Sequence, residues 1–456
     1  MTESAPLIIS ISGIRGIVDQ SLTSQVVRRF AAAFATYLRP GARVVLARDT
    51  RPSGAAFAQA AAAALQDAGC EVLELGKSTT PTAKLMVIEE RADGALIITA
   101  SHNPASWNGL KLIRGDGIFL NAAQSQQVEN IFHANEFRRA SGGTLRPLDP
   151  AACRRRHLQR LLTHVDVEAI RRARLSATAD LCNGAGALLI PELLDELGVE
   201  AVCLNREPNG LFAHDPEPLP ANLVELCEGV RQHGSAIGFA VDPDADRVAL
   251  VDERGQTVGE DYTLALAVQA RTARQRGPVV TTLSTSQTVS DAARAHDCPV
   301  VLTPVGEVHV VEKMLQENAL IGGEGNGGVI LTEVDPGRDA AVGLAIALEA
   351  LAHSGQPLTH LIDTLPRYSI EKRKIECSPD RLEQAVQHLC QTYSRTFVHP
   401  VKDGSKLYLN GTLECPWVHL RASNTEPIVR ILAESASAEE AKKLCDEVEG
   451  IIALNR

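Results

Sequence analysis

This 456-residue chain lacks the cysteine spacings that build zinc sites or disulfide frameworks. Its ten cysteines are scattered and none forms a Cys-x-x-Cys pair, so we expect reduced thiols and a cytoplasmic protein. No apolar run is long enough to span a membrane, and the amino terminus is too short and uncharged for a signal peptide. An excess of positive charge is also missing. The formal net charge of −11 argues against general binding to nucleic acid or to anionic membranes.

The chain has the composition of an ordinary soluble protein, with 45% hydrophobic and 22% charged residues. Its length suits about three or four domains. Strand-like runs at 44–47, 71–75 and 94–98 alternate with helical patterns at 55–68 and 82–91. This alternation predicts an α/β domain with a mostly parallel sheet.

Composition shifts and further strand patterns divide the rest of the chain. We predict three tandem α/β domains with mixed, mostly parallel sheets over residues 1–150, 151–255 and 256–370. Residues 371–456 carry strand patterns between two helical segments. That order predicts a carboxyl-terminal α+β domain with an antiparallel sheet.

The segment Thr99-Ala100-Ser101-His102-Asn103-Pro104 directly follows the apolar run 94–98. A Ser at the carboxyl end of such a strand faces the crevice where open α/β sheets bind ligands. A loop Ser is more often an ordinary turn residue. The motif alone therefore leaves both interpretations open.

Three aspartates, Asp242, Asp244 and Asp246, alternate along a loop between the apolar runs 237–241 and 248–251. Carboxylates in this pattern can gather around a hard divalent cation. An EF-hand is excluded because Arg247 stands where that loop requires Gly, and because the flanking runs are strands. A solvated acidic turn is the alternative, although three acids between buried strands would repel one another without a cation.

A glycine-rich loop, 322–328, contains Glu324 and Asn326, which suit hydrogen bonds to sugar hydroxyls. It lacks the Lys-Ser/Thr of a P-loop, so a flexible turn is equally open.

A second polar loop follows a strand-like run near the carboxyl terminus. Its guanidinium, hydroxyl and amide groups suit a phosphate oxyanion, and an ordinary Ser/Asn turn is the alternative. These groups belong to Arg421, Ser423, Asn424 and Thr425.

Two further cations lie near the Ser101 motif. Arg15 stands in a glycine-flanked loop at 12–16, and Lys111 comes ten residues after Ser101. Either could reach the same cleft, although a surface Arg or Lys is usually only solvated.

In this order, these segments resemble the α-D-phosphohexomutase superfamily over essentially the whole chain. The segment 99–104 resembles its phosphoserine loop, and 242–247 resembles its magnesium loop. Residues 323–328 and 421–427 resemble its sugar-recognition and phosphate-binding loops. The resemblance implies four domains around a central cleft, each contributing one loop.

The resemblance also implies an isomerase that interconverts hexose 6-phosphate and hexose 1-phosphate. Ser101 would carry a phosphoryl group beside a Mg²⁺ ion held by Ser101 itself, Asp242, Asp244 and Asp246. A hexose 1,6-bisphosphate would be the intermediate and activator. Further candidate catalytic residues are Lys111, Arg15 and His102. Candidate substrate contacts are Arg247, Glu324, Asn326, Arg421, Ser423, Asn424 and Thr425.

The sugar loop departs from the pattern of well-known phosphomannomutase/phosphoglucomutase members. It has Asn326 and Gly328 where those members have Ser and His, and Val305-Gly306-Glu307 replaces a His-containing segment. With Gly337-Arg338-Asp339 downstream, the loop resembles archaeal-type phosphoglucosamine mutases. We therefore expect conversion of glucosamine 6-phosphate to glucosamine 1-phosphate.

Two glutamates, Glu307 and Glu324, could favour a cationic 2-amino group on the substrate. Phosphomannomutase/phosphoglucomutase activity is the alternative within the family. A sugar-phosphate phosphatase and a non-catalytic sugar-phosphate binder are alternatives from other classes. We expect small-molecule sugar phosphates as partners, with no nucleic acid or membrane, and a monomer or homodimer.

Overall fold

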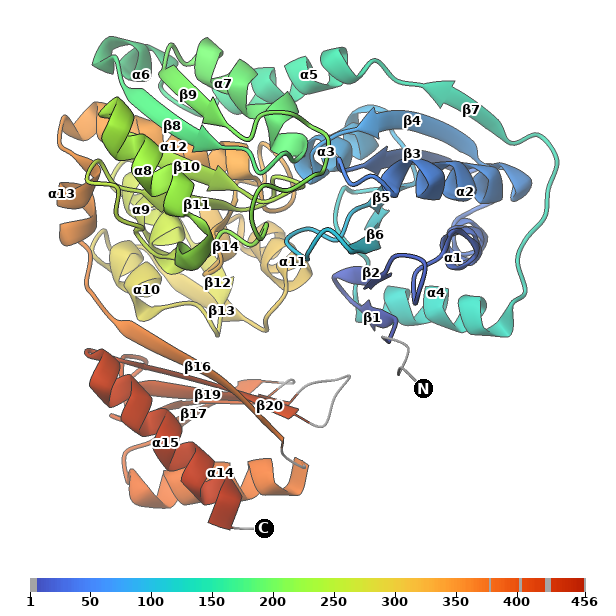
Figure 1. The fold of residues 1–456 in the computed structure, drawn as a ribbon. Coiled ribbons are helices and arrows are strands. Elements are labelled where there is room, and N and C mark those ends of the chain that lie inside the picture. The colour runs from blue at the N-terminus through green and yellow to red at the C-terminus, as the bar shows by residue number, and fades with distance from the viewer. Residues whose placement is uncertain (1–5, 377–378, 402–403, 423–427, 455–456) are drawn as a thin grey trace.

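The computed structural model describes residues 6–376, 379–401, 404–422 and 428–454 (Figure 1). Four sheets follow one another along the chain, and each is the centre of a domain that we number in chain order. The first three domains are α/β and the fourth has an antiparallel sheet with helices. The predicted fold class is confirmed.

The first sheet has the strand order β1-β2-β6-β5-β3-β4-β7. It is parallel from β5 to β7 and antiparallel from β1 to β5, so the alternation of strands and helices predicted only one half of it. Its strands are β1 (Ile8–Ser10), β2 (Gly13–Ile17), β3 (Arg43–Arg48), β4 (Glu71–Lys77), β5 (Gly94–Ile98), β6 (Trp107–Arg114) and β7 (Thr144–Pro147). Its helices are α1 (Ser24–Tyr37), α2 (Gly54–Asp67), α3 (Thr80–Glu89) and α4 (Ala122–Ala134).

The second sheet has the order β11-β10-β8-β9 and the third has the order β13-β12-β14-β15, each with one antiparallel edge strand. The second-domain elements are α5 (Pro150–Leu162), α6 (Val167–Ala173), β8 (Ser176–Asp180), α7 (Ile190–Glu196), β9 (Glu200–Leu204), α8 (Val224–His233), β10 (Ile237–Val241) and β11 (Val248–Val251). The third-domain elements are α9 (Glu260–Thr272), β12 (Val279–Thr282), α10 (Gln287–Arg294), β13 (Val300–Thr303), α11 (Glu307–Glu317), β14 (Ile321–Glu324), β15 (Gly328–Ile330), α12 (Ala340–Ser354) and α13 (Leu358–Asp363).

The fourth sheet has the order β16-β20-β19-β18-β17 and is antiparallel throughout. Figure 1 shows it below the third domain, with both of its helices on the side away from that domain. The elements are β16 (Ser369–Glu376), α14 (Pro379–Thr392), β17 (Phe397–Val401), β18 (Gly404–Tyr408), β19 (Trp417–Ala422), β20 (Ile428–Ser435) and α15 (Ala438–Leu454).

Helix α3 joins the first three domains. Thr79 caps it by accepting a hydrogen bond from the Thr82 amide, and nearly every residue from 80 to 87 is buried. Its apolar side chains pack with β3, β5 and the third-domain helix α11. Three polar side chains of α3 reach the other domains: Thr80 binds Asp244, Thr82 binds His157, and Lys84 binds Glu307. A helix buried on all sides therefore carries its polar groups where partners exist.

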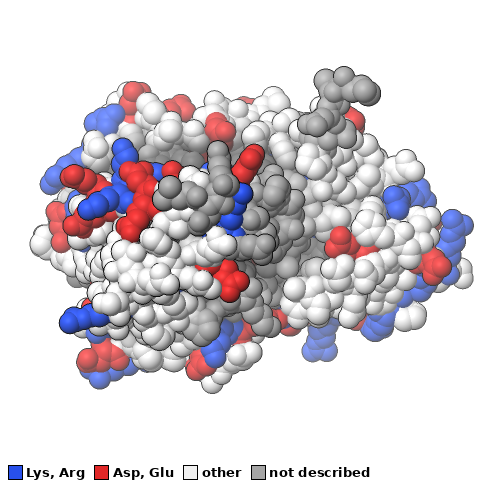
Figure 2. Space-filling view, turned by 90° about the horizontal axis from the view of Figure 1, so that it is seen from below, with Lys and Arg blue, Asp and Glu red and all other residues white. Residues whose placement is uncertain are grey.

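The nine described cysteines are free, and Cys377 lies outside the described residues. Within the described part of the chain, none of the helices combines the length and apolar character needed to cross a membrane. Figure 2 shows basic and acidic side chains interspersed on the face seen from below, which is hollowed between two lobes.

Candidate active site

Ser101 lies just beyond the carboxyl end of β5, whose five residues are all buried. Its backbone is left-handed, with φ at +50°, which is uncommon for a residue with a side chain. Its amide donates to Thr99 Oγ1 at 2.9 Å, and its hydroxyl donates to Asp242 Oδ2 at 2.7 Å. The loop therefore holds the Ser101 hydroxyl against the second domain.

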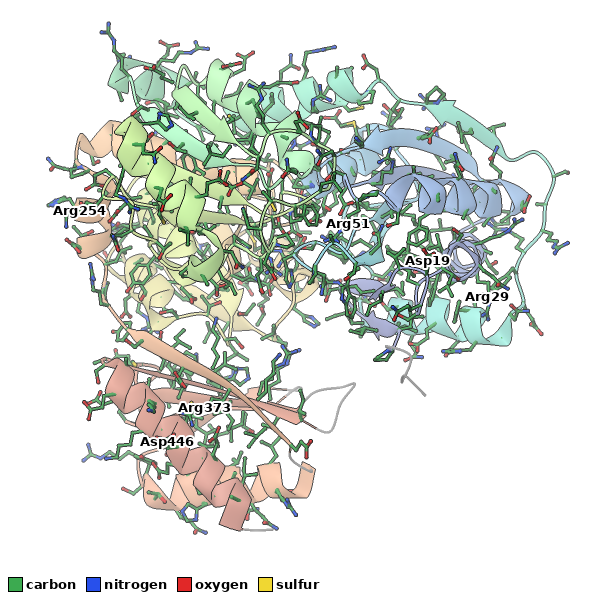
Figure 3. All side chains as sticks on the ribbon, in the orientation of Figure 1. Asp19, Arg29, Arg51, Arg254, Arg373 and Asp446 are labelled. Carbon is green, nitrogen blue, oxygen red and sulfur yellow. The ribbon has the colours of Figure 1, made fainter. Side chains whose placement is uncertain are left out.

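Arg51, which is labelled in Figure 3, follows β3 in the first domain and fixes the shape of the Ser101 loop. Its guanidinium is buried and pairs with Asp49 at 3.1 Å, and Asp49 also accepts from Thr99. The remaining N–H groups donate to loop carbonyls at 2.5 to 2.8 Å, namely those of Ser101, Asn103, Pro104 and Trp107. The sequence analysis missed this clamp. The polar run 48–53 after β3 is the signal that could have revealed it.

The three aspartates among the predicted metal ligands come together in the loop between β10 and β11. Asp242, Asp244 and Asp246 are buried, and each offers an oxygen within 4.8 Å of the others. Asp242 Oδ1 is held by the amides of Asp246 and Arg247. Asp244 Oδ1 and Asp246 Oδ1 are buried with no hydrogen-bond partner among the described residues. Carboxylate oxygens left free in this way suit a hard cation, so the residues fit Mg²⁺.

The electrostatics of the aspartates differ within the loop. Burial, together with the Asp246 and Asp244 carboxylates, raises the pKa of Asp242 well above its usual range. Burial also disfavours the charged form of Asp246, but Arg338, Lys111 and Arg247 more than offset it. They hold the pKa of Asp246 well below its usual range. The pKa values of like charges in one buried site move apart in this way when cations lie closer to one of the charges.

Lys111 approaches the same loop from β6 of the first domain, as the sequence analysis expected. Its Nζ donates to Asp244 Oδ2 at 2.6 Å and to Asp246 Oδ2 at 2.8 Å. Thr80 on α3 donates to the same Asp244 oxygen. Burial alone would lower the pKa of Lys111, but Asp244 and Asp246 raise it. Lys111 is therefore held as an ammonium ion.

Arg15 and His102 lie at the edge of the Ser101 loop. Arg15 donates to Asn103 Oδ1 at 2.8 Å, and His102 Nδ1 lies 3.5 Å from Ser101 Oγ, at the limit of a hydrogen bond. Burial and the cations Arg247 and Arg15 lower the pKa of His102 to about 2, so its imidazole is neutral. Arg247 itself lies 3.8 Å from Asp246 Oδ1, which is too far for a hydrogen bond.

An acid from the second domain also reaches this edge. Glu217, in the loop before α8, lies 3.8 Å from His102 Nε2 and is half-buried. The sequence analysis assigned no role to Glu217.

The glycine-rich loop connects β14 and β15. Asn326 Oδ1 is buried with no hydrogen-bond partner among the described residues, which leaves an acceptor for a ligand. Glu324 is paired with Arg338 at 2.8 Å, and Arg338 also binds Asp246. Glu307 is paired with Lys84 at 2.7 Å and with Arg338 at 3.0 Å. Each of the two glutamates is therefore paired with a cation.

Arg421 lies near the end of β19 in the fourth domain. Ser423, Asn424 and Thr425, the other predicted phosphate contacts, lie outside the described residues. The structure thus brings the Ser101, Asp242, Lys111 and Glu324 groups into one connected network, while the fourth-domain contribution is described only at Arg421.

Comparison with known protein families gives four matches in domain order. Residues 8–139, 155–255 and 259–368 match phosphoglucomutase/phosphomannomutase alpha/beta/alpha domains I, II and III. Residues 399–451 match the phosphoglucomutase/phosphomannomutase carboxyl-terminal domain.

Individual proteins are similar over nearly their whole length. A Thermococcus kodakarensis protein named phosphoglucomutase/phosphomannomutase is 36% identical over 437 residues, which cover 94% of this chain and 95% of that protein. A Methanopyrus kandleri protein named probable phosphoglucosamine mutase is 34% identical over 446 residues, 97% of this chain and 96% of that protein. The crystal structure of a phosphoglucomutase/phosphomannomutase family protein from Burkholderia thailandensis has a TM-score of 0.82 at 24% identity and covers 97% of each chain.

Proposed function

The chain belongs to the phosphoglucomutase/phosphomannomutase family, and on that premise we propose that it is an isomerase that moves a phosphoryl group between O6 and O1 of a hexose. The single observation that carries the proposal is the contact between Ser101 and Asp242. It joins a strand-end hydroxyl of one domain to the carboxylate cluster of the next at 2.7 Å.

We assign the phosphoryl group to Ser101. In the first transfer the P–O bond to Ser101 Oγ breaks as a bond forms to the free hydroxyl oxygen of a hexose monophosphate, which gives a hexose 1,6-bisphosphate. In the second transfer the bisphosphate returns its other phosphoryl group to Ser101 Oγ, and the bond to that sugar oxygen breaks, which leaves the isomeric monophosphate. Asp242, Asp244 and Asp246 would hold Mg²⁺ beside this oxygen. When bound, the ion neutralises charge on the transferred group.

The protein residues position and stabilise these groups. Lys111 has its ammonium between two carboxylates, so we assign it charge stabilisation and not proton abstraction. Arg15 and His102 would contact the phosphoryl group at the loop edge, with His102 as a neutral hydrogen-bond partner. Arg247 would add positive charge there.

Two loops would hold the rest of the substrate. Glu324 and Asn326 would bind sugar hydroxyls. Arg421, with Ser423, Asn424 and Thr425, would hold the phosphate that is not reacting. We propose a hexose phosphate as the one partner needed for the reaction, a monomer or homodimer as the assembly, and the cytoplasm as its location.

For the sugar, we propose glucosamine phosphate. The form of the glycine-rich loop and the similarity to the Methanopyrus kandleri protein support this choice. Phosphoglucomutase/phosphomannomutase activity is the second candidate, because the Thermococcus kodakarensis protein carries that name.

The test is a substrate panel of glucosamine, glucose and mannose 6-phosphates, each with its 1,6-bisphosphate. We expect isomerisation without steady release of inorganic phosphate, and we expect the highest rate with glucosamine 6-phosphate. The Ser101→Ala variant should lose the isomerase activity. Ser106→Ala, at an exposed position of the same loop, is the matched control and should remain active. Comparable rates on all three sugars would contradict the choice of sugar. Steady phosphate release would instead indicate a phosphatase.

A further inference from the structure

One buried guanidinium connects the metal loop to the sugar loop. Arg338, between β15 and α12, is 8% exposed. Its Nη2 donates to Asp246 Oδ2 at 2.9 Å, and its Nη1 donates to Glu324 Oε2 at 2.8 Å. Its Nε lies 3.0 Å from Glu307 Oε2. Three carboxylates from three different segments therefore converge on one side chain.

A second buried cation, the ammonium group of Lys84, also pairs with the Glu307 carboxylate. Lys84 on α3 donates to Glu307 Oε1 at 2.7 Å and lies 3.4 Å from Asp335. Glu307 thus has a cation on each carboxylate oxygen. A buried carboxylate without such partners would be strongly unfavourable, so these pairs are a condition for placing the two glutamates here.

Two glycines leave the space that these cations occupy. A Cβ atom at Gly328 would lie 2.2 Å from Arg338 Cδ, and a Cβ at Gly337 would lie 1.4 Å from Lys84 Nζ. Neither glycine has a positive φ, so close packing and not backbone conformation requires them. Gly328 is the position at which the sugar loop departs from the His of well-known members. The Arg338 side chain fills the space that a side chain at 328 would need.

We propose that Arg338 is a positioning residue that fixes the sugar loop 324–328 against the metal loop 242–247. With Lys84, it also neutralises Glu307 and Glu324. The sugar loop therefore meets its substrate as a hydrogen-bonding surface without net negative charge, and it binds the ring hydroxyl groups and does not attract the charge of an amino group. This inference rests on the proposed function and concerns how the same site recognises its substrate.

The planar guanidinium is central to this role. Its donors point in fixed directions toward Asp246 and Glu324 at once, whereas a Lys ammonium is a single point charge. Arg338→Lys therefore keeps the charge and removes the connection between the loops. Arg338→Met removes both the charge and the connection, and it leaves the Glu324 carboxylate without its cationic partner.

The experiment is calorimetric titration of the full chain, with Mg²⁺ present, with glucosamine 6-phosphate and with glucose 6-phosphate. For Arg338→Lys we expect both sugar phosphates to bind about tenfold more weakly, with an unchanged ratio of the two dissociation constants. For Arg338→Met we expect the ratio to shift about fivefold or more toward glucosamine 6-phosphate, because an unpaired carboxylate then faces its ammonium group. If Arg338 had a purely structural role, both variants would bind both sugar phosphates more weakly by equal factors. That result would overturn the proposal.

Glu307→Gln keeps the side-chain shape and covers the case in which Arg338→Met does not fold. We expect this variant to leave the ratio of the two dissociation constants within about twofold of the wild-type ratio, since Glu307 is already neutralised. A selective loss of glucosamine 6-phosphate would show that Glu307 recognises the ammonium group, and would overturn the proposal. If the wild-type protein binds the sugar phosphates but does not interconvert 6-phosphate and 1-phosphate, the proposed function alone is contradicted. The ratios of the dissociation constants would still decide the role of Arg338. Failure of wild type to bind either sugar phosphate would overturn both.

Discussion

The first three domains and the fourth are attached in different ways. One apolar core runs from the second domain into the third, and another runs from the first into the third, where Val45 and Leu73 pack in one cluster with Val280 and Val308. The apolar core of the fourth domain contains only its own described residues, from 375 to 452. The first three domains therefore form one block that is fixed by apolar burial, and the reacting groups lie in this block.

The fourth domain meets this block through polar contacts. Glu434 accepts hydrogen bonds from Ser286 Oγ and from the Gln287 amide, and Lys406 donates to the Leu283 carbonyl at 2.8 Å. His419 shares a hydrogen bond of 3.0 Å with Ser284. Water can replace such contacts when they separate, at a net cost of about 1 kcal/mol each. The difference teaches that the fourth domain is held to the first three by contacts that can separate while the Ser101 site stays assembled.

Three buried lysines show the same contrast. Burial would lower the pKa of Lys84 and Lys111, but their paired carboxylates raise it. Burial lowers the pKa of Lys406 to about 7, because the attraction of Glu434 offsets only part of the burial effect. Carboxylates therefore compensate the burial of Lys84 and Lys111 fully and that of Lys406 only in part.

The largest effect is expected from breaking the block at Lys111. Lys111→Met leaves Asp244 and Asp246 without a shared cation, and removing one partner of a buried pair costs about 3–5 kcal/mol. We expect kcat/KM to fall by about 10² to 10³ and the melting temperature to fall with it. Lys443→Met, at an exposed position of α15, is the control, and an equal loss there would contradict the assignment.

A smaller and different effect is expected at Arg421. On the proposed function, Arg421→Ala would remove a charged contact to the phosphate that is not reacting, worth about 1.5–3 kcal/mol. Steady-state kinetics should show KM raised by about 10- to 100-fold, with an unchanged melting temperature. Arg430→Ala is the matched control, because Arg430 is exposed and lies opposite Arg421 on the neighbouring strand. The comparison fails if Arg430→Ala has the same effect.

Loosening the polar contact should affect only the fourth domain. The two oxygens of Glu434 accept from Ser286 Oγ, the Gln287 amide and Trp417 Nε1, whereas a Gln side chain has only one oxygen that accepts and carries no charge to attract Lys406. Glu434→Gln should therefore enlarge the radius of gyration in solution scattering and reduce kcat/KM by less than about tenfold. Unfolding of the block should be unchanged. Glu439→Gln, an exposed acid of the same domain, should change neither quantity.

The smallest effect is a dependence on pH. Separation of the fourth domain would return the Lys406 pKa from about 7 toward its ordinary value. Above pH 7 the separated state then binds more protons than the docked state, so docking strengthens as pH rises. His419 stays neutral in this window, because burial and Lys406 lower its pKa to about 3. Scattering should show a more compact protein at pH 9 than at pH 7.5. Lys406→Met should remove the dependence, and its persistence there would exclude Lys406 as the cause.

Local patterns predicted the elements and groups that a short stretch of sequence defines. The apolar run 94–98 predicted β5, and the alternation of Asp242, Asp244 and Asp246 predicted a carboxylate cluster. The helix expected at 82–91 begins at Thr80 because Thr79 caps it. The domain boundaries drawn from composition and the roles of the site residues stay predictions.

Long-range pairing was beyond the sequence alone. The bond from Arg338 to Asp246 spans 92 positions and the bond from Lys84 to Glu307 spans 223, so no local pattern indicates either pair. The antiparallel half of the first sheet was missed because β6 pairs with β2 across the chain. The sequence analysis uses the segment 337–339 only as part of the resemblance to archaeal-type phosphoglucosamine mutases and predicts no contact for Arg338.

The central claim is that Ser101 carries the phosphoryl group in the fixed block. Intact mass spectrometry of the full chain, incubated with a hexose 1,6-bisphosphate and Mg²⁺, tests it directly. We predict a mass gain of one phosphate that maps to Ser101, that is absent from Ser101→Ala and that is lost when hexose monophosphate is added. A chain that gains no phosphate, or a Ser101→Ala variant that gains one equally, would contradict the account.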